Sequence, residues 1–280
     1  MARPRLILVE GIPGSGKTST ARYARDWLER YGTPARLYLE GDWDHPADFE
    51  SVACLTEADM ADLRVRFPAQ ASFLAQHGRQ DNGMWFFNYR RLQAEHGAEP
   101  DTLFEALARF DVYNLPAERF QELLLANWRA FVTDVVGRGV TYVFECCFLQ
   151  NPITTLLAYH NLPVERVRRH IESLAEIIRP LAPQLIYLAR RDVAKTLETV
   201  RRERPQAWAD HVIRYLTEQA YGEAHDLSGF DGVIEFYARR QALELELLPS
   251  LPFSSAVIGD EGDWAARHEA VAVALGDGQV

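Results

Sequence analysis

Cysteine is scarce in this sequence of 280 residues, which contains Cys54, Cys146 and Cys147. Two of these thiols are adjacent and the third is distant, so the spacing fits neither a disulfide framework nor a four-ligand zinc site. We therefore expect free cysteines in a reducing compartment.

Long hydrophobic segments are missing as well. No window approaches the roughly 18 consecutive apolar residues that a membrane-spanning helix needs. The first apolar run, Leu6 to Val9, stops at Glu10 and is too short for an export signal. The sequence therefore predicts a cytoplasmic protein with no membrane partner.

Positive charge is in deficit, because 30 basic residues face 40 acidic ones and leave a net charge of -10. A negative surface repels polyanions, which argues against a nucleic-acid partner. Hydrophobic residues make up 48% of the chain, enough to bury a core and to exclude a wholly disordered protein. The length suits one large domain, with or without an insertion.

Short apolar runs alternate with segments of helical periodicity, the pattern of a parallel sheet covered by helices on both faces. The predicted strands are 6–9, 36–40, 140–144, 184–189 and 254–258. The predicted helices are 17–31, 116–136, 152–160, 164–179, 192–203, 206–225, 234–248 and 264–275. Residues 49–137 show mostly helical patterns and no parallel-strand signal. We therefore expect an α/β fold with a five-stranded parallel sheet and a large helical insertion at 49–137.

One glycine-rich segment, Gly11 to Thr18, fits the pattern G-x-x-x-x-G-K-[ST] between a predicted strand and a predicted helix. Glycines let the backbone curl so that its N–H groups face an anion, and the helix that follows adds the positive end of its dipole. The predicted phosphate-binding residues are Gly11, Gly14, Ser15, Gly16, Lys17, Thr18 and Ser19.

Lysine occurs only at positions 17 and 195, whereas the other basic residues are arginines. Lys17 supplies a compact point charge that reaches the β- and γ-phosphates, which the bulky planar guanidinium of arginine cannot do. Thr18 offers a hydroxyl ligand to Mg²⁺.

The segment Gly11 to Thr18 resembles the Walker A motif of the P-loop NTPase superfamily. That resemblance covers the sheet-forming part of the chain and implies the P-loop fold, with ATP and Mg²⁺ bound. We expect residues 1–280 to form one kinase-like domain. The Asn-Lys-x-Asp string of GTPases and the signature of transporter ATPases are absent. The sequence is therefore similar to the branch of small-molecule kinases and phosphotransferases.

The predicted second strand ends in the acidic segment Glu40 to Asp44. In kinases of this type an acid after the second strand often accepts the proton of the substrate hydroxyl, and strand ends face the ligand crevice. We predict that Asp42 is the general base, with Glu40 and Asp44 as alternatives. A structural alternative is that Asp42 and Asp44 only cap the turn before Pro46.

Residues 190–225 follow the fourth predicted strand and resemble the lid of small kinases. Arginines in such a lid stabilise charge on the transferring phosphate. Arg201 and Arg204 are three residues apart and would share a helical face, so we predict that they are catalytic. The alternative is a solvated helix in which arginines pair with Glu198 and Glu203.

Glu145 ends the third predicted strand, where the superfamily usually carries its Walker B acid. This resemblance implies that Glu145 holds Mg²⁺ together with Thr18, or contacts the substrate. Because many such proteins have aspartate there, a structural role for this glutamate remains the alternative.

The insertion contains an aromatic and basic segment, Met84 to Arg91. Trp85 and Arg90 are candidate substrate contacts there, because an aromatic ring stacks on a ring-bearing substrate and arginine binds an acidic group. His45, beside Asp44, is a further candidate. The alternative for the aromatic residues is a helix core.

Together these features predict an ATP- and Mg²⁺-dependent kinase that transfers the γ-phosphate to a hydroxyl of a small molecule, such as a metabolite or an antibiotic-like acceptor. One alternative is a regulatory ATPase or switch whose insertion binds a protein. Another is a nucleoside or nucleotide kinase. The sequence makes no prediction of the oligomeric state.

Overall fold

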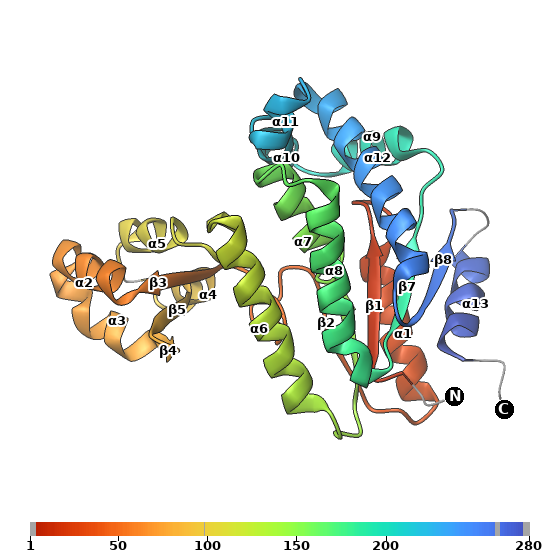
Figure 1. The fold of residues 1–280 in the computed structure, drawn as a ribbon, viewed down its shortest axis with the longest axis horizontal. Helices are drawn as coiled ribbons and strands as arrows, with labels where there is room; N and C mark the ends of the chain where they lie inside the picture. The colour runs from red at the N-terminus through yellow and green to blue at the C-terminus, as the bar shows by residue number, and fades with distance from the viewer. Residues whose placement is uncertain (1–3, 98, 261–263, 277–280) are drawn as a thin grey trace. The chain divides into compact units, whose positions relative to one another are not determined.

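The computed structural model describes residues 4–97, 99–260 and 264–276 (Figure 1). The chain divides into two compact units, each with its own hydrophobic core. Unit 1 consists of Met1–Glu40 and Leu125–Val280, and unit 2 consists of Gly41–Leu124. The second unit therefore starts and ends earlier than the insertion predicted at 49–137.

Unit 1 contains a five-stranded sheet in which every neighbouring pair is parallel, in the order β2-β6-β1-β7-β8. The strands are β1 (Leu6–Gly11), β2 (Ala35–Tyr38), β6 (Thr141–Glu145), β7 (Gln184–Leu188) and β8 (Ser254–Ile258). The central strand β1 is buried along its whole length, as its uninterrupted apolar run predicts. The predicted five-stranded parallel sheet is confirmed.

Helices cover both faces of this sheet (Figure 1). One face packs against α1 (Lys17–Arg30) and α13 (Trp264–Leu275) through a core that includes Ile7, Val143 and Ile258. The other face packs against the aromatic side chains of α6 (Ala117–Val135), where the Trp128 and Phe144 ring centroids lie 5.9 Å apart. The predicted α/β layering is therefore confirmed.

The remaining helices of unit 1 follow the predicted segments closely. They are α7 (Gln150–Thr154), the π-helical turn η3 (Thr155–Tyr159), α8 (Val164–Ile178), η4 (Arg179–Leu181), α9 (Val193–Glu203), α10 (Gln206–Thr217), α11 (Ala220–Ala224), α12 (Gly229–Leu247) and η5 (Leu248–Ser250). The single helix predicted at 206–225 is divided in two. A Cβ at Gly222 would lie 2.4 Å from the Thr217 backbone, so the chain folds back on itself there.

Unit 2 has a three-stranded antiparallel sheet in the order β3-β5-β4, with short helices packed against it. Its elements are β3 (Val52–Thr56), α2 (Glu57–Arg66), η1 (Pro68–Gln70), α3 (Ala71–His77), β4 (Arg79–Asp81), β5 (Met84–Asn88), α4 (Tyr89–Glu95), α5 (Asp101–Ala108) and η2 (Val112–Asn114). Its core joins residues of β3 and β5 to α2, α4 and α5, among them Leu55, Phe87 and Leu103.

The sequence prediction missed the strands of unit 2. A hairpin joins β4 to β5 through Asn82 and Gly83, which have φ values of 48° and 73°. Asn-Gly between two extended segments is the usual signal for such a turn, because both residues tolerate positive φ. The segment Met84 to Asn88 is therefore a strand, and its interpretation as a helix core is wrong.

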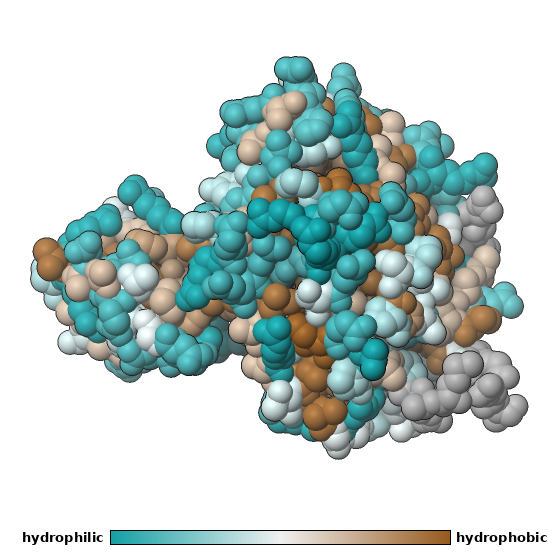
Figure 2. Space-filling model, in the orientation of Figure 1, coloured by the Kyte–Doolittle hydropathy of each residue, from teal (hydrophilic) through white to brown (hydrophobic). Residues whose placement is uncertain are grey.

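Figure 2 shows hydrophilic side chains over much of the visible face. The large apolar side chains that are exposed are scattered along the chain: Tyr31, Trp43, Val65, Val136, Val164, Val257, Trp264 and Val273. Within residues 4–97, 99–260 and 264–276, no helix combines the length and hydropathy needed to cross a membrane.

Candidate active site

The glycine-rich segment forms the turn between β1 and α1 of unit 1. Gly11, Gly14 and Gly16 have φ values of 144°, 78° and 92°, which side chains rarely permit. A Cβ at Gly11 would lie 2.7 Å from the carbonyl oxygen of Leu188, so the turn also has no room for one. The backbone geometry therefore requires glycines at the predicted positions.

Polar groups inside this turn match a polyphosphate. Lys17 is 5% exposed, and its Nζ donates a hydrogen bond to the Ile12 carbonyl, 3.1 Å away. The buried Ser15 Oγ has no hydrogen-bond partner in the structure. A buried ammonium and an unsatisfied hydroxyl beside the amino end of a helix fit an anionic ligand. Ser19 is exposed in the first turn of α1.

Glu145, at the end of β6, lies against the start of α1. The Thr18 hydroxyl donates to Glu145 Oε1 at 2.8 Å, and the Glu40 backbone N–H donates to Glu145 Oε2 at 3.4 Å. Burial raises the pKa of Glu145, whereas the Thr18 hydrogen bond and the charge of Lys17 oppose this effect. The structure thus brings together Thr18 and Glu145, the two residues that the sequence predicts for Mg²⁺.

Glu40 and Cys146 complete a cluster around Glu145. One potential ligand atom of each of these three residues lies within 4.8 Å of the others, the only such group in the described part of the chain. Mg²⁺ prefers oxygen ligands, so the Thr18 hydroxyl and the carboxylates of Glu145 and Glu40 are its suitable donors, while the thiol is not. Burial raises the pKa of Cys146 and keeps the thiol protonated.

The other acidic candidates belong to unit 2 and are held by that unit. Asp44 forms an ion pair with Arg91, and Asn88 Nδ2 donates to the Trp43 carbonyl at 2.8 Å. Asp42 is exposed, and its carbonyl accepts a hydrogen bond from the His45 N–H. Of the three predicted acids, only Glu40 therefore shares a unit with the glycine-rich turn.

His45 is part of the same turn in unit 2. Its Nδ1 accepts a hydrogen bond from the Ala47 N–H at 3.2 Å. Burial lowers the pKa of His45, whereas the negative charges of Asp48 and Asp42 oppose this effect. In this structure His45 therefore stabilises the turn, and its contact with a substrate stays a prediction.

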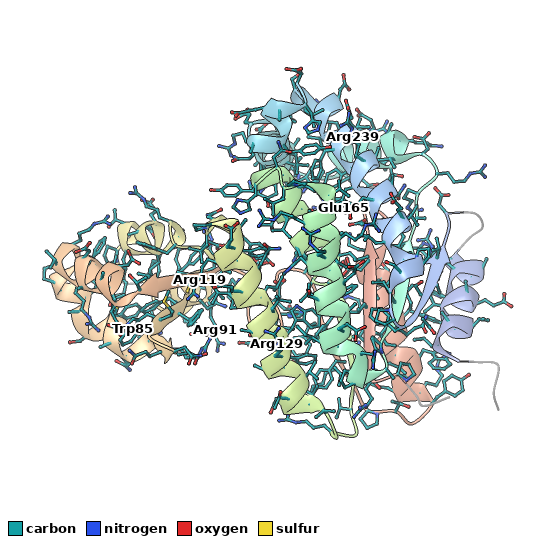
Figure 3. All side chains as sticks on the ribbon, viewed as in Figure 1. Trp85, Arg91, Arg119, Arg129, Glu165 and Arg239 are labelled. Atoms are coloured by element: carbon teal, nitrogen blue, oxygen red, sulfur yellow. The ribbon has the colours of Figure 1, made fainter. Side chains whose placement is uncertain are left out.

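Trp85 and Arg90 lie in β5 and α4 of unit 2, and Trp85 is labelled in Figure 3. The Arg64 guanidinium lies 5.4 Å from the Trp85 ring centroid, and that of Arg90 lies 5.9 Å from the Tyr89 ring. Both candidates already have partners within unit 2, so their contact with a substrate also stays a prediction.

Helix α9 of the predicted lid packs directly on the glycine-rich turn. A Cβ at Gly14 would lie 2.4 Å from the Val200 side chain. The guanidinium of Arg201 lies 4.7 Å from the Phe230 ring centroid, and that of Arg204 lies 4.9 Å from the Trp208 ring. The helix ends at Glu203, so Arg204 is extended and the predicted shared helical face does not include it.

Two arginines that the sequence analysis did not select contact the turn. Arg190 Nη2 donates to the carbonyls of Ser15 and Gly14 at 2.6 and 3.2 Å, and Arg267 Nη1 donates to Ser15 at 3.3 Å. Burial, together with the neighbouring charge of Arg267, lowers the pKa of Arg190. Arg190 lies two residues after the end of β7, and this position beside a strand end was a sequence signal that could have identified it. Arg267 lies in α13, where no motif indicates a functional residue.

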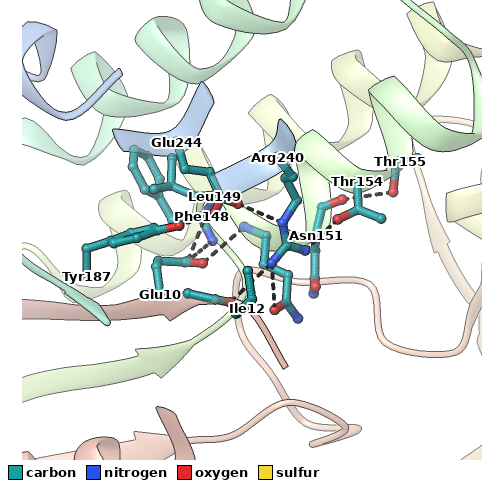
Figure 4. Close-up of polar contacts among 12 residues, drawn as sticks. Glu10, Ile12, Phe148, Leu149, Asn151, Thr154, Thr155, Tyr187, Arg240 and Glu244 are labelled. Atoms are coloured by element: carbon teal, nitrogen blue, oxygen red, sulfur yellow. Dashed lines mark hydrogen bonds and ion pairs between the residues drawn. The ribbon is translucent and has the colours of Figure 1, made fainter. Parts of the chain in front are cut away.

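Glu10 was also not selected from the sequence, although it is the one charged residue in the apolar strand β1. Its buried carboxylate accepts hydrogen bonds from the backbone N–H groups of Phe148, Leu149 and Gln150, at 2.9 to 3.0 Å (Figure 4). Burial raises the pKa of Glu10 to about 7, although these bonds oppose the rise. Glu10 therefore fixes the segment that follows Glu145.

No family model and no curated protein matches this chain. Among solved structures, it is similar to the thymidylate kinase of Ehrlichia chaffeensis, with a TM-score of 0.43 and 13% identity over 98% of this chain and 100% of that one. It is also similar to that of Candida albicans, with a TM-score of 0.42 and 13% identity over 98% and 90% of the two chains.

The architecture is established by the chain's own geometry. Five parallel strands lie between helices, and the glycine-rich turn joins the central strand β1 to α1, with Lys17 and Thr18 at the helix start. Glu145, at the end of the neighbouring strand β6, accepts a hydrogen bond from the Thr18 hydroxyl. This chain has the fold of the P-loop kinases.

Proposed function

We propose that this chain is a phosphotransferase that uses ATP and Mg²⁺ to phosphorylate a hydroxyl of a small molecule. The hydrogen bond of 2.8 Å between Thr18 and Glu145 carries this proposal. It joins the hydroxyl of the phosphate-binding turn to the acid of the adjacent strand, which is the arrangement that a magnesium-bound triphosphate requires.

The chain's own residues divide the work. The backbone of the turn and the Lys17 ammonium bind and orient the phosphates, while Thr18 and Glu145 hold Mg²⁺. When bound, Mg²⁺ neutralises charge on the phosphates. Arg201, at the end of α9, and Arg204, just after it, are proposed to stabilise charge on the transferring group.

We propose Glu40 as the general base, the alternative that the sequence left open beside Asp42. Its Oε1 accepts a hydrogen bond from Gln150 Nε2 at 2.9 Å, and its Oε2 accepts one from the Cys146 thiol at 3.4 Å. Glu40 is exposed, so an acceptor hydroxyl can reach its carboxylate. It would take the proton that this hydroxyl loses when the oxygen attacks the γ-phosphorus.

Two classes of acceptor follow from the sequence, and both belong in a screen. One comprises nucleosides, which would accept the phosphoryl group on a hydroxyl, and nucleoside monophosphates, which would accept it on a phosphate oxygen without need of a general base. The other comprises hydroxyl-bearing metabolites and antibiotics.

The test is acceptor-dependent ADP release, followed by mass spectrometry of the product. Under the proposal, one acceptor class raises ADP release well above the basal rate and gains the mass of one phosphoryl group. A slow hydrolysis that no acceptor accelerates would favour a regulatory ATPase instead, especially if partner binding changed with the nucleotide.

The base is tested by Glu40→Gln with Asp42→Asn as the matched variant. We expect Glu40→Gln to lower the acceptor-dependent rate by about two to four orders of magnitude while ATP affinity is kept. A large rate loss in Asp42→Asn alone would transfer the role to Asp42.

A further inference from the structure

Arg240 of α12 is a fully buried cation in contact with the glycine-rich turn, and Figure 4 shows its polar contacts. Its Nη2 donates to the Gly11 carbonyl at 3.2 Å, and its Nη1 donates to the Thr154 hydroxyl at 2.9 Å. Gly11 is the first residue of the turn, and Thr154 ends α7. One guanidinium therefore contacts the phosphate-binding backbone and the helix that follows β6.

The charge of Arg240 has a dedicated partner. Glu244, one helical turn further along α12, lies 3.1 Å from Arg240 Nε as an ion pair without hydrogen-bond geometry. The Tyr187 hydroxyl donates to the other oxygen of Glu244 at 2.6 Å. Burial favours a lower pKa for Arg240, but the charge of Glu244 prevails and raises it, so the guanidinium stays charged.

Gln150 connects this cation to the proposed base. Its Oε1 accepts from Arg240 Nη2 at 3.5 Å, and its Nε2 donates to Glu40 Oε1 at 2.9 Å. A rotated amide would turn its NH₂ group toward the guanidinium, so Arg240 selects the orientation that donates to Glu40. The Gln150 backbone N–H is fixed by Glu10 Oε2 at 3.0 Å.

We propose that Arg240 is a positioning residue that fixes the phosphate-binding turn through Gly11 and, through Gln150, the carboxylate of Glu40. The inference rests on the proposed function: its first arm, the contact with Gly11, concerns ATP binding, and its second arm, the contact through Gln150, concerns phosphoryl transfer. A buried guanidinium suits this task because its planar donors contact several acceptors at fixed angles, whereas lysine presents a single point charge.

Arg240→Lys keeps the charge beside Glu244 and removes the planar set of donors. We expect it to weaken ATP binding about tenfold, measured by calorimetry without an acceptor, and to lower the acceptor-dependent kcat about tenfold. Gln150→Leu removes only the second arm, so it should lower kcat about tenfold and leave ATP affinity unchanged. This variant keeps the ion pair and serves even if Arg240→Lys fails to fold.

A double variant separates positioning from general stability. If Arg240 acts on Glu40 through Gln150, the double variant Arg240→Lys with Gln150→Leu should lower kcat no more than Arg240→Lys alone. Arg168→Ala is the control, because it breaks the ion pair of 2.8 Å between Arg168 of α8 and Glu246 of α12, the helix that also carries Arg240. Its kcat and ATP affinity should equal those of the wild type.

Unchanged ATP affinity in Arg240→Lys overturns the first arm, and kcat losses that multiply in the double variant overturn the second. Unchanged kcat in Gln150→Leu also overturns the second arm. If no acceptor is ever phosphorylated, the proposed function and the second arm fail together, while calorimetry with ATP still decides the first arm.

Discussion

Buried polar groups serve different ends in the two units. In unit 1, Glu10, Glu145 and Arg240 all bond to the glycine-rich turn or to the segment after β6. In unit 2, the buried Asp111 accepts hydrogen bonds from the Tyr89 hydroxyl at 2.8 Å and from the Tyr113 N–H at 2.9 Å. The polar groups of unit 1 lie around the candidate ligand site, whereas Asp111 of unit 2 joins α4 to η2.

This contrast separates function from architecture. A buried polar group costs free energy unless it is bonded, so each such group reflects either a ligand site or a packing need. The polar groups of unit 1 should control nucleotide binding and turnover. Those of unit 2 should control stability, with little effect on ATP affinity.

The strongest test of this contrast is Lys17→Ala. We expect turnover to fall by about 10³-fold, because the charge that binds the phosphates is lost from a buried site. The fold should persist, since Lys17 lies at the start of α1 and, within the described part of the chain, its side chain donates a hydrogen bond only to the Ile12 carbonyl. Steady-state kinetics and thermal unfolding check both parts.

Lys195→Ala is the matched control, because it removes the only other lysine, which is exposed on α9. It should keep wild-type kinetics. Full activity in Lys17→Ala would contradict the assignment of the turn as a phosphate site.

The next largest effect concerns Glu10 and pH. In the unfolded chain the Glu10 carboxyl has its ordinary pKa of 4.5, whereas burial in the folded chain raises this pKa to about 7. Between these values the folded state holds more protons, so the free energy of unfolding falls as pH rises from about 4.5 to 7. The Glu10 contribution to this fall is on the order of 3 kcal/mol.

Glu10→Gln should lack that contribution, and urea unfolding at several pH values measures the difference. Asp111→Asn provides the comparison in unit 2, because burial raises the pKa of Asp111 to about 6 from an ordinary 3.8. The contribution of Asp111 to the free energy of unfolding should therefore decrease over a lower pH range, from about 3.8 to 6. A wild-type pH profile in Glu10→Gln would contradict the role of its carboxylate.

A smaller effect is expected at the two lid arginines. Arg201→Ala and Arg204→Ala should each lower the acceptor-dependent rate about tenfold to a hundredfold, because each removes a cation that we propose to act on the transferring phosphate. In the structure Arg201 Nη1 lies 3.8 Å from Glu198 Oε1. Arg202→Ala is the control, since Arg202 Nε bonds back to the Glu198 carbonyl of its own helix at 3.1 Å. If the Arg201→Ala and Arg204→Ala variants were as active as the Arg202→Ala control, the role of Arg201 and Arg204 would be limited to packing on aromatic rings.

The smallest effect belongs to unit 2. Tyr89→Phe removes the hydroxyl that donates to Asp111 and should lower the free energy of unfolding by about 1 kcal/mol. ATP affinity should stay at the wild-type value. A change in ATP affinity larger than the change in stability would break the contrast between the units.

The fold of unit 1 was predictable because its signals are local. The run Leu6 to Val9 is buried on both faces, and the glycine-rich turn has fixed spacing that backbone geometry imposes. In unit 2 the aromatic run of β5 has no such spacing. Its only local signal is the pair Asn82-Gly83, and a two-residue signal is easily overlooked beside helical periodicity.

The candidate site was predictable only where a motif names its residues. Thr18 and Glu145, both expected at a magnesium site, are joined by a hydrogen bond, because parallel strands end at the same edge of the sheet. Arg190, Arg240 and Arg267 reach the turn from positions more than 170 residues away in sequence. The position of Arg190 shortly after β7 was a local signal, but no local pattern distinguishes Arg240 and Arg267 from the many surface arginines, because their placement depends on tertiary packing.

The contact between Gly14 and Val200 has a consequence for natural variation. The Val200 methyl occupies the space that a side chain at position 14 would need. Relatives of this chain should therefore change at these two positions in a correlated way, with a bulkier loop residue accompanied by a smaller one on α9. In an alignment of such sequences, positions 14 and 200 should therefore covary.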